Sequence, residues 1–161
     1  MNILLISRPE ISLYRELRQS ETAWDAIRFY DPIIVPMGVF IPVSTFAGAI
    51  TLASDLRYFL RKYTVDHLFQ LRQSIYCTAG LSRSRYLNRD CGVTKDWQYR
   101  MMYWFDGRGI LSRYRSEDWN SEEIICDMPI EEEKRDRLDL QEPQGGHLIQ
   151  VWCTKPEYES L

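Results

Sequence analysis

The sequence has few of the residues from which metal and redox centres are built. It contains two histidines, His67 and His147, and neither stands at a spacing typical of zinc ligands. Its four cysteines are scattered along the chain and include no Cys-x-x-Cys pair. We therefore predict no metal site, and we expect free thiols in a reducing, cytoplasmic environment rather than disulfides.

Glycine is also scarce where a cofactor would need it. Residues 4–10 follow the start of the first apolar run and read LLISRPE, without the glycine-rich turn that cradles dinucleotide phosphates. The chain has no Gly-x-Ser-x-Gly elbow of the kind that presents a nucleophilic serine in α/β-hydrolases. The sequence therefore predicts no cofactor and leaves any catalytic residue unknown.

One stretch lacks charge altogether. No charged residue stands between Asp31 and Asp55, a length sufficient to cross a bilayer. Pro32, Pro36 and Pro42 would, however, interrupt a spanning helix and leave backbone groups unpaired in lipid. We interpret this stretch as a buried extended segment followed by a helix, and we predict no contact with a membrane.

What is present suits one folded domain. The chain has 161 residues, of which 45% are hydrophobic and 13% are aromatic, enough to bury a core. Strand-like and helix-like patterns alternate, which predicts a single α+β domain over 1–153 with a frayed C-terminal tail over 154–161. We expect a mixed or antiparallel sheet with a β-hairpin near 99–115, packed against two to four helices.

The patterns also place the individual elements. We expect strands over 2–7, 122–128 and 147–153, an extended segment over 33–43, a loop over 81–96, and helices over 12–30, 46–63, 65–76 and, as an alternative to a linker, 131–140. Ser20 is a plausible start for a second helix within 12–30, and Thr64 a plausible N-cap for the helix over 65–76.

Charge is distributed very unevenly. Residues 57–115 hold twelve Lys or Arg and four Asp or Glu, a charge of +8, whereas residues 116–161 hold four against thirteen, a charge of −9. A basic segment suits phosphate, because neutralised phosphates release counterions. The alternative is that the acidic last third folds back over the basic middle and neutralises it.

The predicted hairpin concentrates cations and aromatic rings. Asp106-Gly107 between two apolar-rich runs is a strong hairpin signal, and a two-residue turn there or at Gly107-Arg108 sorts the side chains into the same two faces. Tyr99, Met101, Tyr103, Phe105, Ile110, Ser112 and Tyr114 would face the core. The other face would carry Arg100, Met102, Trp104, Leu111, Arg113 and Arg115.

Strand surfaces with arginine and aromatic side chains are used by single-strand nucleic-acid binders. We therefore predict a small soluble nucleic-acid or nucleotide-binding protein. Its predicted ligand-binding residues are Arg83, Arg85, Tyr86, Arg89, Arg100, Trp104, Arg113 and Arg115. The plainer interpretation is that these arginines form the solvent-exposed face of an ordinary antiparallel sheet.

Two other functions remain open from sequence. The acidic segment over 117–142 could imitate nucleic acid and bind a basic protein, as an inhibitor does. Glu132 and Lys134, with Asp118 or Asp127 upstream, weakly resemble the carboxylates and lysine of metal-dependent nucleases. The sequence does not predict the oligomeric state.

Overall fold

The computed structural model describes residues 1–72, 75–88, 97–106, 110–118 and 147–161. In chain order the described elements are β1 (Ile3–Ser7), α1 (Leu13–Gln19), α2 (Glu21–Ile27), a 3-10 turn η1 (Arg28–Tyr30), β2 (Ile33–Val35), β3 (Gly38–Ile41), α3 (Phe46–Asp55), α4 (Arg57–Tyr63), β4 (Thr64–Arg72), β5 (Ile75–Thr78), α5 (Ala79–Asn88), β6 (Arg100–Phe105), β7 (Leu111–Arg115), a 3-10 turn η2 (Ser116–Asp118), β8 (His147–Trp152) and α6 (Lys155–Glu159).

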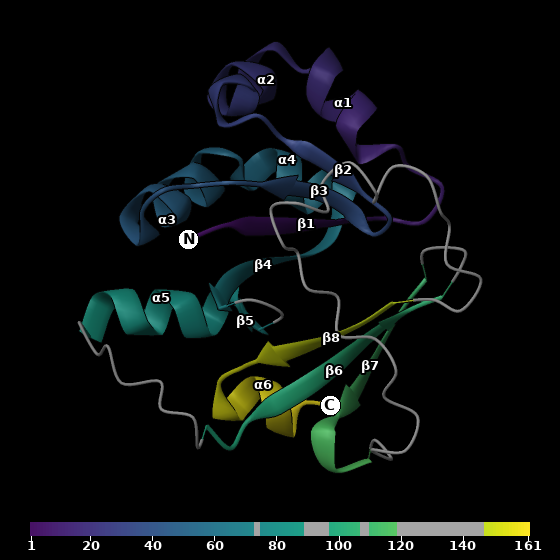
Figure 1. The fold of residues 1–161 in the computed structure, drawn as a ribbon, viewed down its shortest axis with the longest axis vertical. Coiled ribbons are helices and arrows are strands. Elements are labelled where there is room, and N and C mark those ends of the chain that lie inside the picture. Colours follow the sequence, from purple (N-terminus) through teal and green to yellow (C-terminus); the bar gives the residue numbers. More distant parts are fainter. Residues whose placement is uncertain (73–74, 89–96, 107–109, 119–146) are drawn as a thin grey trace.

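The described strands form one eight-stranded sheet in the order β2-β3-β1-β4-β5-β8-β6-β7. Neighbouring strands are antiparallel, except that β5 and β8 are parallel. This confirms the predicted α+β class with a mixed sheet. Figure 1 shows the two halves of the sheet at an angle to each other, with β4 and β5 at the join.

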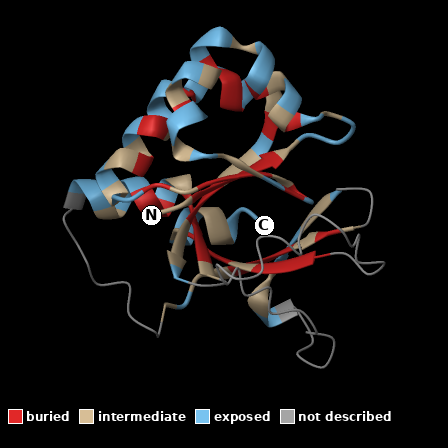
Figure 2. Cartoon of the chain, turned by 45° about the horizontal axis from the view of Figure 1, so that its top comes forward, coloured by how far each residue is buried: buried red, intermediate tan, exposed pale blue. Residues whose placement is uncertain are grey.

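Two apolar clusters lie on opposite faces of this sheet. On one face, alternate residues such as Ile3 and Phe69 pack against the helices α1 to α5 (Figure 1). On the other face, Leu4 and Leu68 from one half share a cluster with Tyr103 and Val151 from the other. Figure 2 shows the buried residues concentrated along the strands. The second cluster therefore joins the two halves of the sheet.

The N-terminal half follows the sequence closely. Ser20 accepts a hydrogen bond from Ala23 N–H and caps α2, as expected. The extended segment forms the two short strands β2 and β3, with the proline-flanked β2 at the edge of the sheet. The expected helix over 46–63 is divided into α3 and α4 at Leu56.

Two predicted elements in the middle of the chain are corrected. Residues 65–72 and 75–76 do not form a helix but lie in β4 and β5, and Leu68 and Phe69 are buried on opposite faces of a central strand. Residues 81–88 are not a loop but the greater part of α5, whose N-terminus is capped by the Thr78 hydroxyl, which accepts from Leu81 N–H at 3.2 Å. The helix has few apolar residues and therefore lacks a helical periodicity.

The C-terminal segment forms a helix rather than a frayed tail. Thr154 and Glu157 make a reciprocal capping box at the start of α6. The Glu157 carboxylate also accepts a hydrogen bond from the Thr78 hydroxyl at 2.7 Å, and the Tyr158 ring lies 5.7 Å from that of Tyr99. These tertiary contacts hold α6 against the sheet.

The predicted hairpin is present, but its register places the side chains of β7 on the opposite faces of the sheet from those predicted. Phe105 pairs with Leu111, and Asp106 N–H donates to Ile110 O at 3.1 Å. This pairing is shifted by one residue relative to a two-residue turn at Gly107-Arg108 and by three relative to one at Asp106-Gly107, an odd number in both cases, so the side chains of one strand change faces. Arg113 therefore shares a face with Tyr103, and Arg100 lies on the opposite face from Arg113 and Arg115.

Some predictions fall outside the described residues. These are the strand over 122–128, the helix or linker over 131–140, the nuclease residues Asp127, Glu132 and Lys134, and nearly all of the acidic segment over 117–142. Among the helices that the structure describes, none is long and apolar enough to span a membrane.

Candidate anion-binding site

A hollow of about 700 Å³ opens between α3, α4, α5 and the beginning of β4. Its apolar lining includes Ile50 and Ala53 from α3, Leu60 from α4 and Phe69 from β4. Its charged lining consists of four arginines, Arg8, Arg57, Arg61 and Arg83, and a single carboxylate, Asp66. His67 completes the wall from β4.

Local sequence explains how α4 presents its arginines. Arg57 and Arg61 are four residues apart, so they lie on the same side of the helix. Leu60, between them in sequence, is buried in the helix-side cluster and fixes the helix against the sheet. Both arginines are exposed.

Arg8 secures the other end of α4. Its Nε donates to Lys62 O at 3.1 Å and its Nη2 donates to Arg61 O at 3.0 Å. Its backbone N–H donates to Tyr63 O. A cation on the last carbonyl groups of a helix is favourable for the helix dipole. Arg8 thus positions α4 and also adds positive charge at the rim of the hollow.

The only carboxylate lining the described hollow is already engaged. Asp66 Oδ2 accepts from the Tyr103 hydroxyl at 2.8 Å and from Arg113 Nη2 at 3.3 Å. Asp66 Oδ1 accepts from the backbone N–H of His67 at 2.8 Å. Its charge is therefore compensated by Arg113 from outside the hollow, and among the described residues no other carboxylate lines the hollow to balance its arginines.

Arg57, Arg61 and Arg83 form no side-chain hydrogen bond or ion pair within the described parts of the chain. Three guanidinium groups around one concave surface raise the local positive potential, and low-dielectric walls strengthen it. A compact anion would remove this repulsion, and the fork of donors on each arginine matches phosphate oxygens.

His67 is a partly buried ionisable group in the wall of the hollow. Burial lowers its pKa below the usual value, the Arg83 charge lowers it further, and only Asp66 opposes the shift. Its ring lies 5.9 Å from that of Phe69 in an edge-to-face arrangement. In the hollow as the structure describes it, the imidazole is neutral near pH 7.

A smaller hollow of about 260 Å³ adjoins the first and shares Val65, Asp66 and Ala79 with it. Its wall includes Arg113 from β7, and Glu157 and Leu161 from the C-terminal segment. The Asp66–Arg113 ion pair thus stands at the boundary between the two hollows.

Of the predicted binding residues that the structure describes, a single one lies in the larger hollow. Arg83 lines it. Arg85 is half-buried on the same helix, and the ring of Tyr86 packs against that of Phe46 at 5.8 Å. Arg89 lies outside the described residues.

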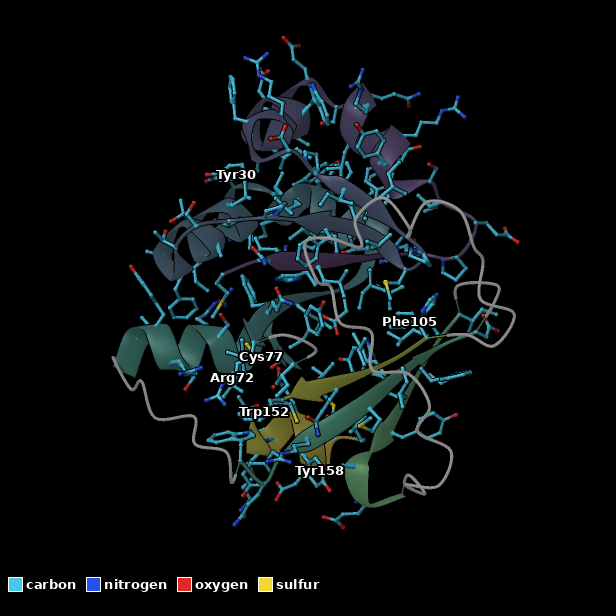
Figure 3. All side chains as sticks on the ribbon, in the orientation of Figure 1. Tyr30, Arg72, Cys77, Phe105, Trp152 and Tyr158 are labelled. Atoms are coloured by element: carbon cyan, nitrogen blue, oxygen red, sulfur yellow. The ribbon has the colours of Figure 1, made fainter. Side chains whose placement is uncertain are left out.

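The hairpin residues do not form the single expected surface. Arg100 donates from Nε to Trp97 O at 2.7 Å and stacks over Trp152. Arg113 pairs with Asp66, and Arg115 lies over the Tyr158 ring. Trp104 is half-buried and shares the face of Arg100 rather than that of Arg113. Figure 3 shows Trp152, the last residue of β8, and Tyr158 in α6. Arg100 stacks over the first ring and Arg115 over the second.

Comparisons with family models, curated proteins and solved structures find no match to this chain.

The residues that sequence reasoning missed are Arg8, Arg57, Arg61 and His67. The i, i+4 spacing of Arg57 and Arg61 was a visible signal of a shared helix face. Arg8 and Arg83 come from distant parts of the chain, and only the packing of β1, β4 and α5 brings them to α4.

Proposed function

We propose that the protein binds a phosphate-bearing ligand, a nucleotide or a nucleic acid, in the larger hollow. The observation that carries this proposal is the convergence of Arg57, Arg61 and Arg83 on one concave surface without partners among the described residues. This keeps the ligand class predicted from the basic middle of the chain and moves its site from the hairpin to α4 and α5.

The dimensions and surroundings of the hollow support this choice. A volume of about 700 Å³ lies within the range of roughly 300–1,000 Å³ that is usual for small-ligand sites. Tyr58, next to Arg57 on α4, is 79% exposed, and Tyr86 on α5 is 48% exposed. Exposed aromatic rings beside cations provide stacking surfaces for bases.

The test is binding of a fluorescent single-stranded oligonucleotide and of a fluorescent adenosine monophosphate, followed by anisotropy between 50 and 300 mM salt. We expect Arg57→Gln, Arg61→Gln and Arg83→Gln each to weaken binding by about tenfold, because each removes charge-assisted hydrogen bonds to phosphate. Affinity should fall steeply as salt rises.

The matched control is Arg15→Gln, which removes the same charge from an exposed position on α1, away from the hollow. It should change affinity less than twofold. The wild-type chain failing to bind either probe at 50 mM salt, or all four variants weakening binding equally, would contradict the proposal.

A further inference from the structure

We propose, on the basis of the proposed function, that the hollow selects a phosphate monoester, and that His67 is the specificity-determining residue that takes up a proton when this group binds. The monoester is either a free nucleoside monophosphate or the phosphorylated end of a nucleic-acid strand. An internal phosphodiester would be the weaker ligand.

The arrangement of the cations favours a compact, doubly charged group. Arg57 and Arg61 approach from α4 and Arg83 from α5, so the three charges surround one hollow rather than follow a line across the surface. A monoester carries a charge of about −1.5 to −2 near pH 7 and has three strongly accepting oxygens. A diester has one negative charge and leaves more of the cationic repulsion in place.

His67 lines the hollow, so an anion bound there would change the protonation of its imidazole. In the part of the chain that the structure describes, its imidazole has no hydrogen-bond partner. The charged groups that face it are Asp66 on its own strand, Arg83 on α5, Arg57 and Arg61 on α4, and Arg8 after β1; α3 contributes no charged side chain to the hollow.

These groups determine the direction of the effect. Without ligand, burial and the charge of Arg83 disfavour an imidazolium, and Asp66 is already engaged by Arg113 and Tyr103. A dianion bound among the same arginines offsets most of their positive charge, and its own negative charge raises the pKa of His67. The imidazole then accepts a proton from the solvent and donates a hydrogen bond to a phosphate oxygen, with no covalent bond made or broken.

The first arm of the test uses inorganic sulfate, because sulfate is a dianion that does not titrate between pH 5.5 and 8. Nuclear magnetic resonance follows the imidazole protons of the two histidines, which the His67→Gln variant assigns. We expect saturating sulfate to raise the pKa of His67 by at least one unit, whereas His147, which does not line the hollow, stays unchanged.

The second arm compares ligands by calorimetry in buffers of different ionisation enthalpy. Wild-type protein should bind adenosine 5′-monophosphate at least tenfold more tightly than its methyl diester at pH 6.5. The sulfate titration should show net proton uptake. In His67→Gln, the uptake should disappear and the preference should fall to threefold or less, while sulfate still binds.

A third arm separates the two sources of the monoester. An oligonucleotide with a 5′-phosphate should bind more tightly than adenosine monophosphate if strand ends are the ligand, and more weakly if free nucleotides are. Binding of sulfate without a pKa change at His67, or equal affinity for monoester and diester, would overturn this inference and leave the proposed function standing. Loss of all binding would overturn both.

Discussion

At the scale of single residues, Glu157 joins the C-terminal helix to the rest of the molecule. Its Oε2 accepts from the Thr78 hydroxyl at 2.7 Å and from both the backbone N–H and the hydroxyl of Thr154 at 2.8 Å. Gly80, in the first turn of α5, leaves room for this carboxylate, because a Cβ at that position would collide with Glu157 Oε1. The carboxylate also lies favourably near the N-terminus of α5.

Gly80→Ala tests this contact. Alanine ordinarily stabilises a helix relative to glycine by up to about 1 kcal/mol. Here we expect a loss of roughly 1–2 kcal/mol, because the added methyl group displaces a carboxylate held by three hydrogen bonds. Urea denaturation measures the change. In a Glu157→Ala background the same substitution should be neutral or stabilising, and a loss of equal size there would contradict the assignment.

At the scale of elements, α6 shows how tertiary contacts order a short segment. A helix of this length is unstable alone. It is held by its capping box, by Glu157, and by Tyr158, whose ring lies beneath the Arg115 guanidinium at 5.3 Å. The charged and short sequence after Thr154 has no apolar stripe, and for this reason it resembles a frayed end.

Removal of residues 155–161 should therefore destabilise the chain by roughly 2–4 kcal/mol, because it exposes apolar surface and leaves Thr78 without its acceptor. Thermal and urea unfolding measure this. The control is Lys155→Ala, which breaks only a solvent-exposed ion pair with Glu159 and should change stability by less than about 0.5 kcal/mol. Equal stability of the truncated and full chains would restore the frayed-tail prediction.

The predictions for the segments that form β4, β5 and α5 were wrong because local patterns there do not reflect tertiary packing. Leu68, Leu71 and Ile75 are spaced as in an amphipathic helix, but Leu68 and Leu71 lie in β4 and Ile75 in β5. Both are central strands with buried residues on both faces, where alternation is not required. In α5, only Leu81 and Ser82 among residues 81–87 are buried, so the helix shows no stripe. Capping by Thr78 and packing against β4 and β5 hold it instead.

At the scale of the whole molecule, the continuous sheet makes the two halves interdependent. The second apolar cluster contains residues of β1, β4, β6 and β8, and Cys77 and Trp152 pair across β5 and β8 (Figure 3). If one half unfolded, the apolar residues that the other half contributes to this cluster would be exposed to water, and the other half would lose stability.

We therefore predict a single cooperative unfolding transition for the described domain. Tryptophan fluorescence reports on both halves, through Trp24 in α2 and Trp104 in β6 among others. Its urea curve should coincide with that from far-ultraviolet circular dichroism, with the same midpoint and slope. Two separated transitions would show that the sheet halves unfold independently.

The sequence by itself determined the α+β class, the first strand, the paired helices with the cap at Ser20, and the existence of the hairpin. These features depend on local periodicity, capping and turn residues, which act over a few neighbouring positions. It also determined that the middle of the chain carries excess positive charge. Among the predicted binding residues that the structure describes, Arg83 also lines the candidate hollow.

Only the tertiary structure decided which arginines have no partner among the described residues. A connection over residues 106–110 rather than a two-residue turn placed Arg113 against Asp66 and separated it from Arg100. The arginines of α4 and α5 instead met at a hollow with Arg8 and His67, because strand order and helix packing bring distant segments together. Local patterns contain no information on such long-range neutralisation, which depends on where each charge lies in three dimensions.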